Sequence, residues 1–128
     1  MRYLLDTHAF LWFVLDDQRI SNEAKSIIEN SKNEIYFSAA SAWEIAIKIK
    51  LARLKIKGEF ETFIIDQLST NSFVPLSISI SHSLYTHRLP QVHKDPFDRI
   101  IIAQSKLENL PLISKDREIR KYKIAMVW

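Results

Sequence analysis

The segment RYLLD, Arg2–Asp6, decides how the rest of this 128-residue sequence is interpreted. A short apolar run that stops at a charged residue is typical of a buried strand. A helical pattern with several apolar side chains follows at once, over His8–Leu15. We therefore expect Arg2–Leu5 to be a core strand, with Asp6 directly after its carboxyl end.

Four further strand-like segments follow this first strand, and helical patterns separate them. The strands are expected at Glu34–Ser38, Phe73–Leu76, Leu110–Ser114 and Ile124–Trp128. The further helices are expected at Ser21–Ser31, Ser41–Arg53, Glu59–Leu68, Ser79–Leu89, Asp95–Glu108 and Asp116–Lys121. Strands that alternate with helices imply right-handed crossovers and a parallel β-sheet flanked by helices on both faces. We expect an α/β fold that forms one domain over residues 1–128.

The content of cysteine, glycine and histidine excludes several kinds of site. There is no cysteine, which rules out disulfides and thiolate metal sites. A phosphate-binding P-loop, a dinucleotide fingerprint and a G-x-S-x-G elbow each need more than one glycine, and the chain has only Gly58. The four histidines form no H-E-x-x-H motif and no other zinc spacing. Any phosphate chemistry must therefore use side chains and a metal ion.

The charge of the chain is mildly basic, with 18 basic and 15 acidic residues, a net charge of +3 and a pI near 9.2. A mixed, solvated surface explains this balance by itself. The basic residues are nevertheless gathered in two runs, which could hold the phosphates of a polyanion beside an acidic pocket. The runs consist of Lys48, Lys50, Arg53, Lys55 and Lys57, and of Lys115, Arg117, Arg120, Lys121 and Lys123.

No segment approaches the roughly 20 apolar residues that span a bilayer. A signal-peptide core of about 7–15 apolar residues cannot precede Asp6. The apolar stretch Ala9–Leu15 ends in two aspartates without a small-residue cleavage site. We expect a cytoplasmic protein that is not associated with a membrane.

Four acids are predicted to lie at one edge of the sheet. Asp6 and Asp116 follow strands, and Glu44 and Asp98 fall in the first turn of the helices that come next. Open parallel sheets bind ligands outside the carboxyl ends of their strands, where helix N-termini also converge. These positions therefore predict a shared acidic site.

Each acid also has a local explanation at a helix end. Ser41 and Glu44 match the S-x-x-E capping box, and Asp95 suits an N-cap position. The other acids that helix ends could explain are Asp6, Asp98 and Asp116. Capping gives no reason, however, for all four candidate acids to share one edge.

A divalent cation would explain the whole set. Several ionised carboxylates close together repel one another, which raises their pKa values and lowers stability. Mg²⁺ and Mn²⁺ prefer oxygen ligands, and Mg²⁺ usually keeps some of its waters. Such a site suits hydrolysis of a phosphodiester, in which Asp98 or Asp116 could orient the water or accept its proton.

The ordered set of motifs resembles the PIN-domain family, and within it the VapC-type toxins of bacterial type II toxin–antitoxin systems. The resemblance covers nearly the whole chain, in the expected order and at typical spacing. The segments that carry it are Tyr3–His8, Ser38–Ile45, His93–Arg99 with Ile102–Gln104, and Leu112–Asp116.

The resemblance implies Mg²⁺- or Mn²⁺-dependent endonucleolytic cleavage of RNA in such a pocket. Asp6, Glu44 and Asp98 match the three acids found most regularly in the family, and Asp116 matches a fourth, more variable one. Thr7 and Ser114 match hydroxyl positions, which we expect to supply supporting hydrogen bonds. Many relatives have threonine where this chain has Ser114, a change that keeps the hydroxyl.

The family also implies partners, namely an RNA substrate (tRNA, rRNA or mRNA), a cognate antitoxin protein and a second copy of the chain. Phe10, Phe13 and Ile20 could serve the protein contacts or the core. His93 is either a residue that orients the acidic motif or a surface histidine. The basic residues that could contact phosphate, or could be solvated surface charges, are Lys48, Arg88, Arg99 and Arg117.

Two alternatives remain at this stage. A phosphoacceptor receiver domain or a phosphatase could also carry an acidic pocket, but a receiver needs an acidic pair after its first strand, and Asp6-Thr7 offers none. A PIN-like domain that binds RNA or a partner without cutting is the second alternative. The presence of all four acids argues against it.

Overall fold

The strand at residues 2–5 is the centre of the sheet. The computed structural model describes all residues, 1–128, and every strand pairing in it is parallel. The strand order is β3-β2-β1-β4-β5, which leaves β1 with two strands on each side. The strands are β1 (Arg2–Leu5), β2 (Glu34–Ser38), β3 (Val74–Leu76), β4 (Leu112–Ile113) and β5 (Met126–Val127). The expected α/β class and parallel sheet are confirmed.

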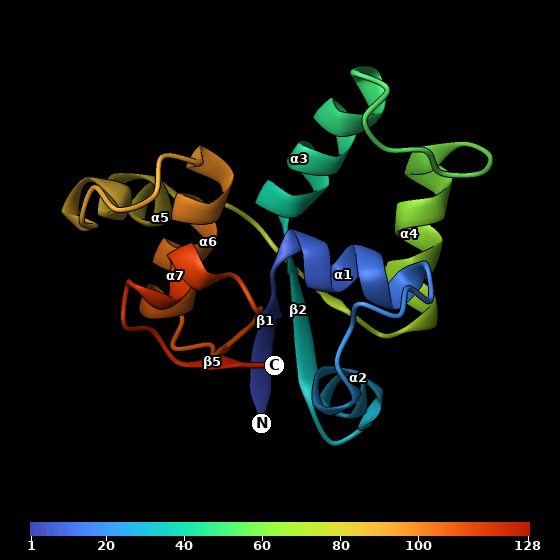
Figure 1. Ribbon diagram of the computed structural model, residues 1–128, viewed down its shortest axis with the longest axis horizontal. Coiled ribbons are helices and arrows are strands. Elements are labelled where there is room, and N and C mark those ends of the chain that lie inside the picture. Colours follow the sequence, from blue (N-terminus) through green and yellow to red (C-terminus); the bar gives the residue numbers. More distant parts are fainter.

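Helices cover both faces of this sheet, as Figure 1 shows. One layer consists of α1 (Thr7–Val14), α2 (Asn22–Glu29), α3 (Ala39–Lys50) and α4 (Phe60–Thr70). The other consists of α5 (Ile80–Tyr85), the short 3₁₀ helix η1 (Thr86–Arg88), α6 (Pro96–Leu107) and α7 (Arg117–Arg120). None of the helices is both long and apolar enough to cross a membrane.

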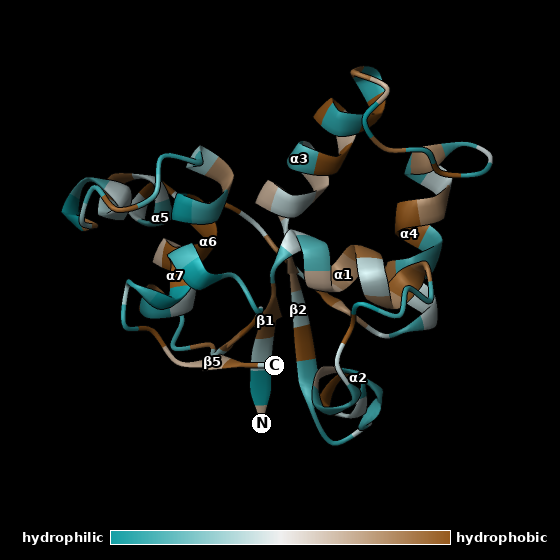
Figure 2. Ribbon diagram, in the orientation of Figure 1, coloured by the Kyte–Doolittle hydropathy of each residue, from teal (hydrophilic) through white to brown (hydrophobic).

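Each face of the sheet has its own apolar core, because neighbouring residues of a strand point to opposite faces. Leu5 packs in the first core with Phe10 of α1, whereas Leu4 packs in the second core with Ile101 and Ile102 of α6. In Figure 2 brown segments of β2 and α6 mark their apolar residues, and the turn between α2 and β2 is teal. The sheet is therefore buried on both sides.

The register of β1 determines what lies at the carboxyl edge. Leu5 pairs with Phe37 of β2 and with Ile113 of β4. The residues that follow these three are Asp6, Ser38 and Ser114, so they lie side by side where the strands end. The backbone N–H of Asp6 donates to the carbonyl of Ile113 at 3.2 Å, which extends the pairing to the first acid.

Several expected boundaries were wrong. The helix expected to start at Ser41 starts at Ala39, because the hydroxyl of Ser38 accepts a hydrogen bond from the Ala40 N–H at 3.0 Å. The helix expected over residues 79–89 divides into α5 and η1. The strand expected at 110–114 is shorter, since the Leu110 N–H closes the end of α6 on Ser105 and Pro111 has no N–H.

Phe10 belongs to the core and not to a partner surface. It is fully buried, and its ring lies 4.3 Å from that of Phe37 and 6.1 Å from that of Phe73, centroid to centroid. Phe13 and Ile20 are partly buried against the same core. Of the two roles considered for these three residues, partner contact and core packing, their burial supports core packing.

Phe10→Ala should lower the free energy of unfolding by about 3–5 kcal/mol, because it removes a buried ring and leaves a cavity. Urea denaturation would measure this loss. Ile65→Ala on α4 is the matched control, since Ile65 is 64% exposed and should change stability by less than about 0.5 kcal/mol. Equal losses in both variants would contradict the assignment of Phe10 to the core.

Candidate active site

Asp6 is held rigidly at the edge of the sheet. It is the N-cap of α1, and its Oδ1 accepts a hydrogen bond from the Ala9 N–H at 2.8 Å. Its Oδ2 accepts a hydrogen bond from the Ser114 hydroxyl. Burial raises the pKa of this carboxyl, and the nearby charge of Asp116 raises it further, while the hydrogen bonds from Ser114 and Ala9 oppose the change. Both the capping explanation and the site explanation therefore fit Asp6.

The hydroxyl residues connect the elements around Asp6. The Ser114 hydroxyl donates to Asp6 and accepts from the Asp116 N–H at 3.1 Å, so it ties the first acid to the fourth. The hydroxyls of Thr7 and Ser41 lie 2.9 Å apart and join α1 to α3. Thr7 and Ser114 thus both make side-chain hydrogen bonds beside the first acid.

Glu44 lies in the second turn of α3, not in the first, and it forms no capping box. Ser38 caps the helix instead, and the Ser41 hydroxyl is engaged with Thr7. Glu44 is only 7% exposed, and its Oε2 lies 3.1 Å from Nζ of Lys48. Its Oε1 is buried without any hydrogen-bond partner. A buried carboxylate oxygen left unpaired is costly, and a bound cation would satisfy it.

Asp98 is placed by the start of α6. Asp95 caps this helix by accepting from the N–H groups of Phe97 and Asp98, at 2.9 and 3.2 Å. The Oδ2 of Asp98 lies 2.7 Å from Nε2 of His93. Asp95 is therefore a helix cap, and His93 is hydrogen-bonded to Asp98 and is not a free surface histidine.

The pKa of Asp98 is raised to about 7. Burial is the main cause, and the carboxylates of Asp95, Glu44 and Asp6 add to it, while the hydrogen bond with His93 opposes it. Repulsion among these acids shows that they share one electrostatic environment. A site of this kind favours either protons or a cation.

Asp116 reaches Asp98 from the same helical layer, at the start of α7. It caps α7, its Oδ1 accepting from the N–H groups of Glu118 and Ile119 at 2.8 and 3.4 Å. One ligand atom from each of Asp116, Asp98 and His93 lies within 4.8 Å of the others. This compact group contains a histidine nitrogen in addition to the carboxylates expected from the sequence.

The free oxygen atoms of the cluster suit a hard divalent cation. Three acids each keep one carboxylate oxygen without a hydrogen bond: Oε1 of Glu44, Oδ1 of Asp98 and Oδ2 of Asp116. Asp6 uses both of its oxygens, on Ala9 and on Ser114. Carboxylate oxygens are the ligands that Mg²⁺ and Mn²⁺ prefer. The donor set therefore fits such an ion.

The basic residues proposed as phosphate contacts differ in their surroundings. Arg117 lines the same hollow as Asp6 and Asp116, whereas Arg88 is exposed on η1. Lys48 is paired with Glu44. The guanidinium of Arg99 donates to the Tyr122 hydroxyl and to four backbone carbonyls, which holds the loop before α6 in place. Arg99 thus has a structural use and is not free to bind phosphate.

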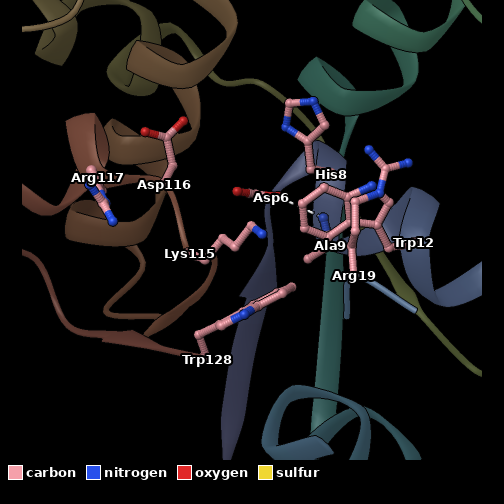
Figure 3. A pocket seen from close by; sticks show the side chains of 9 residues that line it. All are labelled: Asp6, His8, Ala9, Trp12, Arg19, Lys115, Asp116, Arg117 and Trp128. Atoms are coloured by element: carbon pink, nitrogen blue, oxygen red, sulfur yellow. Dashed lines mark hydrogen bonds between the residues drawn. The ribbon is translucent and has the colours of Figure 1, made fainter. Parts of the chain in front are cut away.

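A hollow of about 420 Å³ opens beside Asp6 and Asp116. Figure 3 shows the side chains that line it. Besides Asp6 and Asp116, its walls include Trp12, Trp128 and Lys115. The sequence alone did not identify these three residues as part of the site. Lys115 was visible only as a member of a basic run, and the approach of Trp12 to Trp128 depends on tertiary structure.

Raised acid pKa values predict how stability depends on pH. An acid with a higher pKa in the folded state binds its proton more tightly there, so the free energy of unfolding falls as the pH rises from 3.8 to about 7. Asp98→Asn should remove much of this fall, which thermal melts in EDTA across that range would measure. Asp66→Asn, a change on the exposed surface of α4, should keep it. An unchanged slope in Asp98→Asn would contradict the raised pKa.

Comparison with curated proteins points to one family. Residues 3–125 match the family model described as PIN domain. The chain is 27% identical over 121 residues to Ribonuclease VapC22 of Mycobacterium tuberculosis, a match that covers 94% of this chain and 91% of the relative. It is 34% identical over 64 residues to Ribonuclease VapC16 of the same organism, which covers 50% of this chain and 45% of that relative.

Solved structures share the fold. VapBC2 from Rickettsia felis, bound to a DNA fragment from its promoter, contains a chain that superposes with a TM-score of 0.75 at 17% identity, covering 100% of this chain and 99% of that one. FitAcB from Neisseria gonorrhoeae gives a TM-score of 0.64 at 16% identity, covering 100% and 97%. At such low identity the likeness is one of architecture alone.

Proposed function

Since the chain belongs to the PIN-domain family, we propose that it is a metal-dependent endoribonuclease that acts as the toxin of a toxin–antitoxin pair. Its two curated relatives carry the name ribonuclease, which supports hydrolysis of RNA by this chain. The observation that carries the proposal is the buried, unpaired Oε1 of Glu44 beside acids that repel one another. A receiver domain finds no support in this family match.

We assign Asp6, Glu44, Asp98 and Asp116 to a site for Mg²⁺ or Mn²⁺. When bound, the ion would supply the positive charge that activates water and stabilises the charge developing on the phosphate. The protein's part is to hold the ligands. Lys48 leaves one oxygen of Glu44 available, and the Nε2 of His93 leaves one oxygen of Asp98 available.

The hydroxyls make a second contribution by fixing the acids before any ion arrives. Ser114 holds the side chain of Asp6 and the backbone of Asp116, which come from opposite helical layers. The Thr7–Ser41 contact keeps the start of α1 against α3, the helix that carries Glu44. A preorganised ligand set binds its ion with less loss of conformational entropy.

The same proposal includes the partners and the setting of the protein. We propose that residues 1–128 act as one nuclease domain in the cytoplasm, with an RNA substrate, a cognate antitoxin protein and a second copy of the chain. Apolar side chains are available for the protein contacts. Ile80 and Leu84, one helical turn apart on α5, are 77% and 69% exposed.

Asp6→Asn and Asp98→Asn should each reduce RNA cleavage by at least about 10- to 100-fold, because each removes a negative charge from the ion site. The assay is cleavage of labelled tRNAs and single-stranded RNAs with Mg²⁺ or Mn²⁺, and with EDTA. Asp66→Asn, purified identically, should cut as well as the parent. Cutting that survives EDTA, or that persists in both site variants, would contradict the proposal.

A further inference from the structure

The hollow beside the acids has an aromatic and basic wall that the cleavage chemistry leaves unexplained. We call Trp12, Trp128, Arg19 and Lys115 together the tryptophan pocket (Figure 3). Its volume of about 420 Å³ falls within the range of roughly 300–1,000 Å³ that is usual for ligand sites. Because the same hollow is lined by Asp6 and Asp116, the pocket is continuous with the acidic site.

The two tryptophans are only partly explained by packing. Their ring centroids lie 5.7 Å apart and the planes meet at 67°. Trp128 packs partly against the apolar core, whereas Trp12 contacts Trp128, the ring of His8 at 5.6 Å, and two cations. A base can therefore reach this half-buried indole by displacing one of the two cations that lie over its ring.

The basic residues bring positive charge to these rings. The guanidinium carbon of Arg19 lies 5.0 Å from the Trp12 ring centroid, and Nζ of Lys115 lies 4.8 Å from it. Asp17 holds Arg19 through hydrogen bonds of 3.1 Å to Nε and 2.7 Å to one terminal nitrogen, which leaves the other terminal nitrogen free. Arg117 adds a further charge to the same hollow.

We propose that the tryptophan pocket binds an unpaired nucleotide next to the scissile phosphate, with its base stacked on Trp12 and its phosphate on Arg19 and Lys115. This inference rests on the proposed function. Single-stranded RNA is commonly held by bases stacked on aromatic rings and by basic side chains along its backbone. A base paired in a duplex cannot reach an aromatic ring in this way, so the pocket selects unpaired segments.

A second hollow indicates the path of the strand beyond the pocket. It shares His8, Trp12 and Arg19 with the first, and it continues to Lys48 and Arg53 on the side of α3. Arg53 is exposed and can contact a phosphate there, whereas Lys48 is paired with Glu44. The strand would therefore run from the acids past Trp12 toward the carboxyl end of α3.

Binding in EDTA tests the pocket without any cleavage. The chain has three tryptophans, so Trp43→Phe, a change at a 60% exposed position outside the pocket, leaves Trp12 and Trp128 as the only indole fluorophores, which can be excited selectively over the tyrosines. Titration with a single-stranded RNA of roughly ten nucleotides should quench their fluorescence to saturation. Trp12→Leu should weaken RNA binding, measured by anisotropy of labelled RNA, by about 5- to 100-fold.

An abasic oligonucleotide of the same length separates stacking from a merely structural role. If Trp12 stacks on a base, Trp12→Leu weakens binding of the RNA and leaves binding of the abasic chain unchanged. If Trp12 only supports the fold, both ligands lose affinity equally, which overturns the proposal. Lys115→Gln, which leaves the aromatic wall intact, should weaken both ligands and reduce the salt dependence of binding by about one charge.

The outcomes also separate this inference from the proposed function. If Trp12→Leu binds RNA with unchanged affinity and still cleaves it with metal, only the nucleotide assignment of the tryptophan pocket is rejected. A partner protein would then be favoured as the occupant of the pocket. If the protein shows no metal-dependent cleavage but its RNA binding still depends on the bases, the nuclease proposal is rejected and the assignment of the tryptophan pocket as a base-binding site stands.

Discussion

The pairing of Leu5 with both Phe37 and Ile113 is the constraint on which the site depends. Because three parallel strands end at the same level, the next residue of each reaches the same edge of the sheet. A shift of one residue would turn every side chain of β1 to the other face, exchanging Leu4 and Leu5 between the two cores. Burial of two separate cores therefore keeps Asp6 in register with Ser114.

This arrangement gathers acidic side chains at the starts of helices. Asp6, Asp98 and Asp116 each accept backbone N–H groups or stand in the first turn of a helix, where the helix dipole favours an anion. Glu44 has no such help, since it lies deeper in α3. Its charge is compensated by Lys48 through Oε2, while its buried Oε1 keeps no partner.

Sequence patterns predicted the sheet and both helical layers, because these follow from buried apolar runs and from parallel topology. Of the four predicted acids, Asp98 and Asp116 lie with ligand atoms within 4.8 Å of each other, in a group that Asp6 and Glu44 do not join. The patterns placed Glu44 in the wrong turn of its helix. Ser38 and Ser41 are both suitable N-caps, and which of them caps α3 depends on where β2 ends. The patterns also failed at Arg99, whose carbonyl partners lie in a loop without periodicity. The contact of Trp12 with Trp128 joins residues from opposite ends of the chain, which no local pattern can indicate.

The hydrogen bond of 2.6 Å between the Ser38 hydroxyl and Oε1 of Gln104 has a mechanical consequence. It joins the strand end that leads into α3 to the middle of α6, and both atoms are buried. Glu44 belongs to α3 and Asp98 to α6, so this bond limits how far the two halves of the cleft can hinge apart. The distance between Glu44 and Asp98 therefore depends on the packing of α3 and α6 at the sheet. Local unfolding of either helical layer should separate the acids and abolish the site.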